Sequence, residues 1–165
     1  MLRLELDKAT ATLQSLNLRT EKHGEQNVPA ADIDVSVARS ADVLAEFSPT
    51  LKDFIFDPAG PRDLAEGLPI RDKHLKYPLH RDEEMTGATV LIGYGVGEPM
   101  RIADAKVSKF RITPHEGGGV VVEFRVQCKP EPEQIAKLYT LQASQIEISL
   151  KPVDLPELGG GEGPK

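Results

Sequence analysis

The sequence predicts an α+β protein built mainly on an antiparallel sheet, either a curved sheet or a partly open β-barrel, with two short helices. Three observations lead to this prediction. Several segments alternate apolar and polar residues, which is the period of a half-buried strand. The 13 prolines and 14 glycines indicate many turns. The strand-like segments of the second half are joined by connections of hairpin length, which favours antiparallel neighbours.

The chain has 165 residues, enough for one domain with a hydrophobic core. We expect a single β-rich domain over residues 1–153. A long loop is expected over residues 57–86, because this stretch contains four prolines and has no sustained hydrophobic period. Residues 154–165 are rich in glycine and predict a flexible C-terminal tail.

The first part of the chain predicts strands. The leucines near the start alternate with charged residues, so residues 2–19 are expected to form one or two strands. Residues 20–30 (TEKHGEQNVPA) are polar and contain glycine and proline, which predicts a loop or a hairpin connection. Residues 31–40 (ADIDVSVARS) alternate again and predict a strand with one solvated face.

Two helical regions are expected. Ser40 is a good N-cap, and Asp42 in the first turn favours the helix dipole. A further turn is expected over residues 50–56, and a second helix over residues 131–142, which begin with acidic residues and Pro132. The side chains expected to be buried are Val43, Leu44, Phe47, Leu51, Phe54 and Ile55 in the first region, and Ile135, Leu138 and Tyr139 in the second.

Four strands are expected in the second half, over residues 88–95, 100–114, 119–128 and 145–153. The third of them alternates most strongly, with its valines, Phe124 and Cys128 toward the core. In the second, Val107 and Lys109 are expected on one face, and Ser108 and Phe110 on the other. A change of parity around residues 103–105 predicts a bulge or bend.

The glycine triplet at residues 117–119 resembles a ligand loop at first sight. A phosphate-binding loop lies between a strand and a helix, because the helix N-terminus holds the anion. Here strand-like segments lie on both sides, and no Lys-Ser/Thr pair follows. The sequence therefore favours a hairpin turn that uses positive φ angles.

Recognisable catalytic and metal-binding motifs are absent from the sequence. The four histidines lack metal-ligand spacing, and a site built from His80, Asp82 and Glu84 competes with a simple solvated loop. Asp32 and Asp34 share a strand face and suit cation binding or acid–base work, or else a solvated face. Cys128 alternates with inward valines and is expected to be a buried thiol. We therefore expect a protein without catalytic residues or a cofactor.

The most informative patch is the basic stretch IRDKHLKYPLHR over residues 70–81. It interleaves cations with an aromatic ring, as single-strand channels do for phosphates and bases. The alternative is a solvated loop that Leu75, Tyr77 and Leu79 fix to the core. The candidate nucleic-acid-binding residues are Arg71, Lys73, Lys76, Tyr77 and Arg81. Outward strand residues could extend them into a strip if they share a face: Arg101, Lys106, Lys109, Arg111 and Arg125.

Composition limits the cellular setting. The formal net charge of −6 argues against coating nucleic acid by bulk charge, although a local basic groove is compatible with it. Neither a secretory signal nor a run of apolar residues long enough to cross a membrane is present in the sequence. The single cysteine fits a reducing compartment, so we expect a cytoplasmic protein.

Three segments carry a family resemblance: LNLRTEKHGEQNVPAADIDVSV, EMTGATVLIGYG and VSKFRITPHEGGGVVVEFRVQCKPEPEQIAKL. They resemble an uncharacterised family of small proteins of tailed bacteriophages and prophages, over roughly residues 9–152. The resemblance implies a phage context near DNA replication or recombination functions, and hence the cytoplasm of a bacterial host cell. It transfers no functional residue, because no motif of that family has an assigned chemical role.

Two hypotheses follow. The first is a non-enzymatic phage accessory protein of DNA metabolism that binds single-stranded DNA or takes part in recombination. The second is a protein-interaction module that binds a host or phage protein, or assembles into a homo-oligomeric scaffold through an exposed strand edge.

Overall fold

The computed structural model describes residues 2–59 and 67–153. The expected C-terminal tail and part of the expected long loop lie outside these residues. The elements in chain order are β1 (Leu6–His23), β2 (Gln26–Ser40), the 3-10 helix η1 (Ala41–Glu46), α1 (Leu51–Ile55), β3 (Leu79–Arg81), β4 (Met85–Gly93), β5 (Met100–Pro114), β6 (Gly119–Cys128), α2 (Pro132–Leu141) and β7 (Gln145–Lys151).

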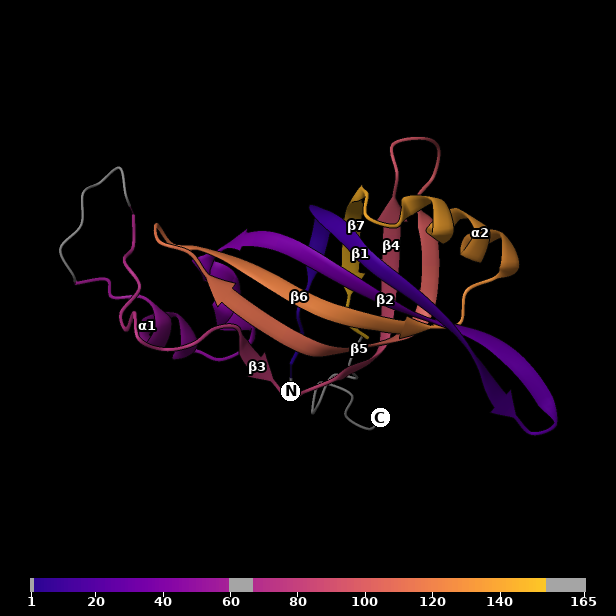
Figure 1. The fold of residues 1–165 in the computed structure, drawn as a ribbon, viewed down its shortest axis with the longest axis horizontal. Helices are drawn as coiled ribbons and strands as arrows, with labels where there is room; N and C mark the ends of the chain where they lie inside the picture. Colours follow the sequence, from indigo (N-terminus) through magenta and orange to yellow (C-terminus); the bar gives the residue numbers. More distant parts are fainter. Residues whose placement is uncertain (1, 60–66, 154–165) are drawn as a thin grey trace, which may run out of the picture.

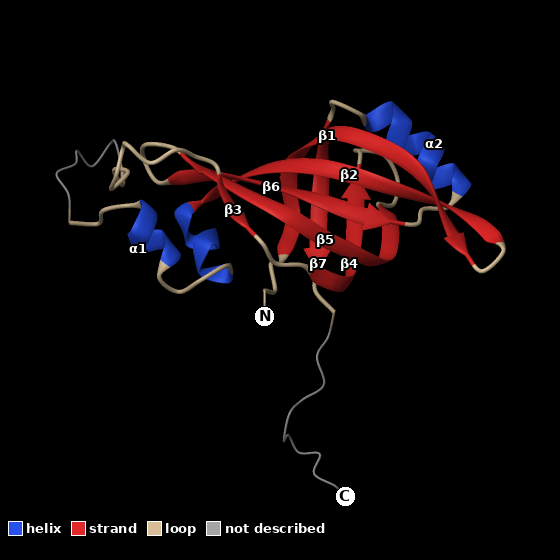
Figure 2. Ribbon diagram, turned by 60° about the horizontal axis from the view of Figure 1, so that its bottom comes forward, coloured by secondary structure: helices blue, strands red, loops and turns tan. Residues whose placement is uncertain are grey.

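Six strands close into an antiparallel barrel (Figure 1). Around the barrel, the order is β1, β2, β6, β5, β4 and β7, and β7 pairs with β1 again. The prediction of an antiparallel α+β fold is confirmed, but the barrel is closed rather than partly open. The short strand β3 adds to β5 outside this ring. Helices α1 and α2 lie at opposite ends of the molecule (Figure 2).

Bulges bend the long strands so that the barrel can close. Lys8, Asp104 and Lys109 have φ angles of 51°, 57° and 58°, and the strand register shifts beside each of them. An extra residue in one strand increases the local twist and curvature, which is how small barrels turn their corners. The bulge predicted around residues 103–105 is therefore confirmed at Asp104.

The expected alternation at Val107–Phe110 is wrong. Ser108 pairs with Arg125 and Arg111 pairs with Glu123, so Lys109 and Phe110 together oppose the single residue Phe124. This bulge keeps both Val107 and Phe110 fully buried while Lys109 is exposed. A strict period of two would instead have placed Lys109 on the same face as Val107.

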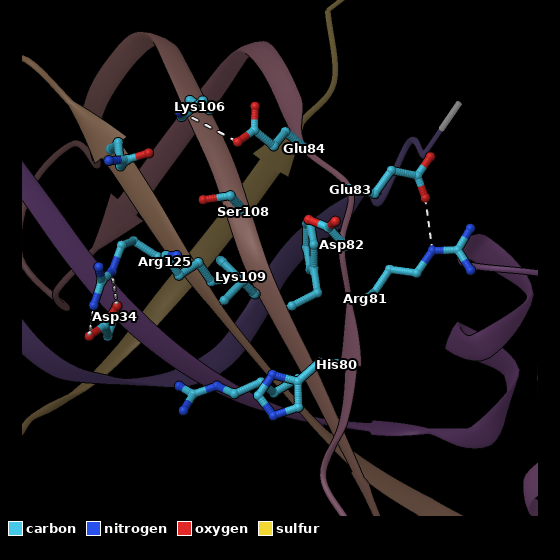
Figure 3. A pocket seen from close by; sticks show the side chains of 14 residues that line it. Asp34, His80, Arg81, Asp82, Glu83, Glu84, Lys106, Ser108, Lys109 and Arg125 are labelled. Carbon is cyan, nitrogen blue, oxygen red and sulfur yellow. Dashed lines mark hydrogen bonds and ion pairs between the residues drawn. The ribbon is translucent and has the colours of Figure 1, made fainter.

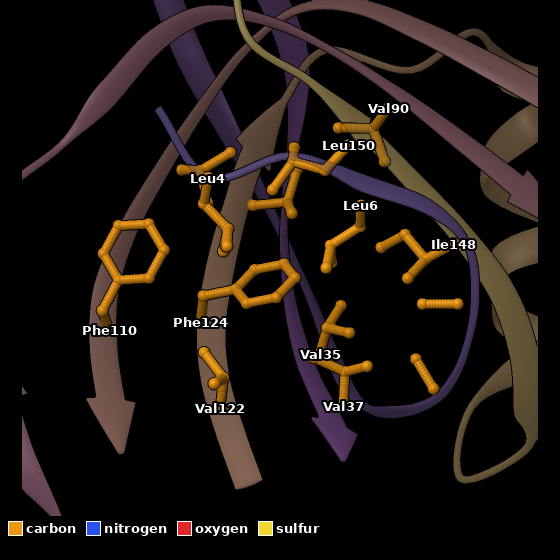
Figure 4. Close-up of a cluster of buried hydrophobic side chains, with 14 of the residues drawn as sticks. Leu4, Leu6, Val35, Val37, Val90, Phe110, Val122, Phe124, Ile148 and Leu150 are labelled. Carbon is orange, nitrogen blue, oxygen red and sulfur yellow. The ribbon is translucent and has the colours of Figure 1, made fainter. Parts of the chain in front are cut away.

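The barrel interior is filled by side chains from every wall (Figure 4). Strand β6 alternates without exception between buried and half-buried residues, as predicted. Phe110 packs against Phe47 and Phe124, with ring centroids 5.5 Å and 6.1 Å apart. Leu4, from the segment before β1, is fully buried and lies among these side chains. The interior is therefore a packed core rather than a ligand cavity.

The hairpin of β1 and β2 is longer than the sequence suggested. The strands continue to His23 and resume at Gln26, with Gly24 in a left-handed turn between them. Most of residues 20–30 is therefore strand, so the loop alternative is wrong and the hairpin connection is confirmed. The outer part of this hairpin extends beyond the barrel (Figure 1).

The helices are shorter and more exposed than expected. The region after Ser40 forms a 3-10 helix, and α1 has only five residues. Leu44, Phe47, Ile55 and Leu138 are buried as predicted, but Phe54 and Tyr139 are 53% and 57% exposed. Each helix is held to the barrel along a narrow stripe, so residues one position away from that stripe face solvent. The expected loop also contains β3 and the first residues of β4.

Candidate functional site

Arg71 fastens the predicted basic loop to α1. Its Nε donates a hydrogen bond to the carbonyl oxygen of Asp53 (2.7 Å), and its Nη2 donates to that of Phe56 (3.2 Å). Nη1 lies 3.7 Å from the carboxylate of Asp57. Carbonyls at the C-terminal end of a helix lack intrahelical partners and favour cations. The guanidinium of Arg71 is therefore already occupied by the protein.

The next residues of the loop are divided between ion pairing, solvent and the protein interior. Lys73 Nζ lies 3.4 Å from Glu116, in the turn between β5 and β6. Lys76 is exposed and forms no ion pair with the part of the chain that the structure describes. The Tyr77 hydroxyl is buried without a hydrogen-bond partner among the described residues. Burial, with a smaller contribution from the charge of Asp72, raises the pKa of Tyr77. Its ring is only half-buried, but its polar end points into the protein.

Arg81 lies apart from the rest of the predicted loop site. Its Nε donates a 2.8 Å hydrogen bond to Glu83, which also accepts one from the backbone N–H of Leu2. The hydrogen bond from Arg81 is the main reason that the pKa of Glu83 is below its ordinary value. Of the five predicted loop residues, Arg81 is the one that lines the groove described next.

An open groove of about 710 Å³ runs along the outer face of β5 and β6, beside β3 (Figure 3). Four of the five outward strand cations predicted to form a strip line it, and Arg101 does not. The charged residues that line the groove are the cations Arg81, Lys106, Lys109, Arg111 and Arg125 and the carboxylates Asp34, Asp82, Glu83 and Glu84, with His80 at the same face.

A bidentate ion pair in the groove joins Arg125 to Asp34. Two nitrogens of Arg125 donate to the two carboxylate oxygens of Asp34, at 2.8 Å and 3.3 Å, and the hydroxyl of Ser15 donates to the same group at 2.9 Å. Burial raises the pKa of Asp34. These hydrogen bonds and the charges of Arg125 and Arg111 together lower it by more, so the net shift is downward. Asp34 is therefore held as a carboxylate.

The remaining groove cations differ in how far they are neutralised. Lys106 lies 3.6 Å from Glu84. Arg111 has one nitrogen 3.9 Å from Glu123, but its Nε is buried with no hydrogen-bond partner in the described part of the chain. Lys109 is exposed and forms no ion pair within residues 2–59 and 67–153. Lys109 is thus the cation most open to an added anion, and Arg111 follows it because its side chain is partly exposed and only distantly paired.

The other sequence candidates have structural explanations. Asp32 is paired with Arg19 at 3.1 Å, so Asp32 and Asp34 each serve a different arginine. Gly117 and Gly118 have φ angles of 104° and 100°, which confirms the hairpin turn. The backbone N–H of Gly117 donates to the carbonyl oxygen of Leu68. Gly67 lies so close to the carbonyl of Gly117 that a Cβ at position 67 would have no room. The glycine triplet therefore packs closely against residues 67 and 68 of the expected long loop.

Cys128 is buried as predicted, and burial is the main reason that its pKa is raised to about 12. The thiol is therefore not nucleophilic near neutral pH. Within the residues that the structure describes, no three or more His, Cys, Asp or Glu side chains are arranged to hold a metal ion. The described helices also include none with the length and apolar character needed to cross a membrane.

Comparison of the chain with protein-family models, curated proteins and solved structures found no match.

Proposed function

We propose that this protein is a non-enzymatic phage accessory protein of DNA metabolism that binds single-stranded nucleic acid in the groove on the outer face of β5 and β6. One observation carries the proposal. Five cations and His80 line one concave surface there. Phosphate neutralisation by such cations is the main source of affinity for nucleic acids.

The position of the groove supports this function by analogy. Strands β4, β5 and β6 form a meander, after which a helix leads to β7, which pairs back with β4. Five-stranded OB-fold barrels bind oligonucleotides on the face of their second and third strands. The groove here lies on the second and third strands of the meander. The six-stranded, fully antiparallel closure is different, so the analogy concerns position alone.

The carboxylates in the groove set the expected strength of binding. Exposed ion pairs contribute only about 0–1 kcal/mol, so a phosphate is able to replace a carboxylate partner of Lys106 or Arg81. The rings of Phe110 and Phe124 point into the core, and the described groove lining offers no exposed aromatic ring for base stacking. We therefore expect weak binding with little sequence preference.

The test is a fluorescence-anisotropy titration of a labelled oligothymidine at low salt, repeated as the salt concentration rises. If about three phosphates are neutralised, the logarithm of the binding constant falls with a slope of about −2 against the logarithm of the salt concentration. The double variant Lys109→Glu, Arg111→Glu is expected to bind at least about tenfold more weakly. Absence of binding by the wild type at high micromolar protein contradicts the proposal.

A matched control separates the groove from net charge. The double variant Lys22→Glu, Lys151→Glu carries the same charge change on the hairpin tip and on β7, away from the groove. It is expected to keep its affinity within about threefold, because exposed charges beyond about 10 Å are largely screened. An equal loss in both double variants would place the binding elsewhere.

A protein-interaction module is the second candidate. Its supporting observations are the near balance of five cations and four carboxylates in the groove, and the exposed apolar side chains of Phe54 and Leu75. A partner of mixed charge suits such a surface better than a polyanion does. Mass measurement of the purified protein and pull-down from a host lysate test it. A monomer that retains no partner contradicts it.

A further inference from the structure

Lys109 occupies a backbone conformation that a lysine adopts only under strain. Its φ angle of 58° lies in the left-handed region, where glycine is favoured. Strained positions of this kind persist where the surrounding structure imposes them, and they gather at functional sites. The strain at Lys109 is therefore a reason to ask what this side chain does.

The bulge at Lys109 places extra positive charge on the groove face. Because Lys109 and Phe110 together oppose Phe124, Lys109 stays on the outer side of β5 with Ser108 and Arg111. All three line the groove. In Figure 3, Lys109 is drawn between the Arg125–Asp34 pair and the Arg81–Glu83 pair. Without the extra residue, a lysine at this position would have pointed into the barrel.

Two further donors accompany Lys109. Arg111 has its Nε buried and without a hydrogen-bond partner among the described residues, although a buried donor is normally satisfied. His80 on β3 is the direct cross-strand partner of Arg111, so the two side chains project from the same face, with Cβ atoms roughly 5 Å apart. His80 also lines the groove.

We propose that Lys109, Arg111 and His80 form a subsite for one tetrahedral oxyanion of the phosphate class. An ammonium, a guanidinium and an imidazole N–H would each donate to an oxygen of the anion, with Arg111 donating from the exposed part of its side chain rather than from its buried Nε. The phosphate group comes either from a nucleic-acid backbone or from free phosphate. The first source rests on the function proposed above, and the second does not.

The direct test is an NMR titration of the full-length protein with inorganic phosphate, against sodium chloride at equal ionic strength. Saturable shifts of the Arg111 guanidinium signals and of the backbone amides of residues 108–111 are expected. The Lys109→Gly variant is expected to bind phosphate at least about tenfold more weakly, because it loses a charged donor. Arg111→Lys keeps the charge but removes the guanidinium, and it is expected to lose the same signals and much of the affinity.

Lys8→Gly is the matched control. Lys8 is also a bulged lysine with positive φ, at 51°, but it lies on β1 outside the groove. Glycine adopts this conformation without strain, so both glycine variants are expected to unfold at a higher temperature than the wild type. Only Lys109→Gly is expected to lose phosphate. Loss of binding in a stabilised protein does not result from misfolding.

The outcomes separate the two proposals. Weaker binding of both phosphate and oligothymidine by Lys109→Gly supports the subsite as part of the nucleic-acid groove. Phosphate binding that depends on Lys109, in a protein that binds no oligothymidine, supports the subsite and contradicts the proposed function. A wild type that does not bind phosphate, or equal losses in Lys8→Gly and Lys109→Gly, overturns the subsite. Phosphate binding that depends on Lys109, together with oligothymidine binding that does not, supports the subsite for free phosphate and contradicts its part in the nucleic-acid groove.

Discussion

The basic loop at residues 70–81 has four cations and the groove on β5 and β6 has five, with Arg81 in both, but the fold uses these cations differently. In the loop, Arg71 is bound to two backbone carbonyls near α1, and Lys73 is paired with Glu116. In the groove, Lys109 and Arg111 project from paired strands toward solvent. A strand inside a sheet already has its backbone groups satisfied by its neighbours. The contrast teaches that a cation which satisfies backbone carbonyls, such as Arg71, is committed to the fold, whereas a cation on a paired strand meets side chains or solvent.

The largest expected effect concerns the support of the groove. Replacing Phe110 by alanine removes a fully buried ring that packs on Phe47 and Phe124. We expect it to lower the free energy of unfolding by about 3–5 kcal/mol, measured by chemical denaturation. Phe54→Ala, at a ring that is 53% exposed, is the control and should cost less than about 1 kcal/mol. Equal costs would contradict the inward position that the Lys109 bulge gives to Phe110.

The next prediction separates Arg71, a cation that holds the loop to α1, from cations that bind nucleic acid. Arg71→Ala is expected to lower the free energy of unfolding by about 1–3 kcal/mol, because two hydrogen bonds from a charged group are lost. Its affinity for oligothymidine should not change. Lys76→Ala, on the same loop but without an ion pair to the described residues, should leave stability within about 0.5 kcal/mol. If Arg71→Ala weakens oligonucleotide binding and leaves stability unchanged, the loop is the binding site that the sequence suggested.

A smaller effect is the acid dependence of the Arg125–Asp34 pair. The pKa of Asp34 is lowered in the folded state, so this carboxylate contributes stability above the pKa of an unfolded aspartate, about 3.9. That contribution is lost as the pH falls through the lower, folded pKa. It amounts to less than about 1 kcal/mol, since the pair is partly exposed. Asp34→Asn should therefore show a shallower loss of stability below about pH 4. If the stability of Asp34→Asn and that of the wild type fall equally steeply in acid, the pair does not contribute to stability.

Much of the barrel was predictable from residues that alternate. The pattern of β6, from Val120 to Cys128, gave the correct inward face, and so did Ile146, Ile148 and Leu150 on β7. The closure of the barrel by β1 and β7 was not predictable from the sequence, because residues such as Ala9 and Ile148 pair across most of the chain and leave no local signal. The outer hairpin resembled a loop because strands that are exposed on both faces show no alternation.

The candidate site was only partly predictable. The sequence named all five groove cations but not their common face, and it placed the main site on the loop instead. A signal for the bulge was present, because Val107 and Phe110 are three residues apart whereas Phe110 and Ile112 are two apart. Two inward residues at a spacing of three within a strand require one extra residue between them. The fastening role of Arg71 was not predictable, since it depends on where α1 ends in space.

The smallest expected effect concerns Asp82, which lines the groove and forms no ion pair with the described residues. Its charge opposes that of an incoming phosphate, whereas the other three groove carboxylates are each held by a cation. Asp82→Asn should therefore bind oligothymidine about two- to threefold more tightly at low salt, and the gain should vanish as salt screens the charge. Glu46→Gln makes the same charge change beside η1, outside the groove, and should have no such effect. An equal gain in both variants would show that net charge, rather than the groove, governs binding, and the distinction between loop and groove would then have no bearing on nucleic-acid affinity.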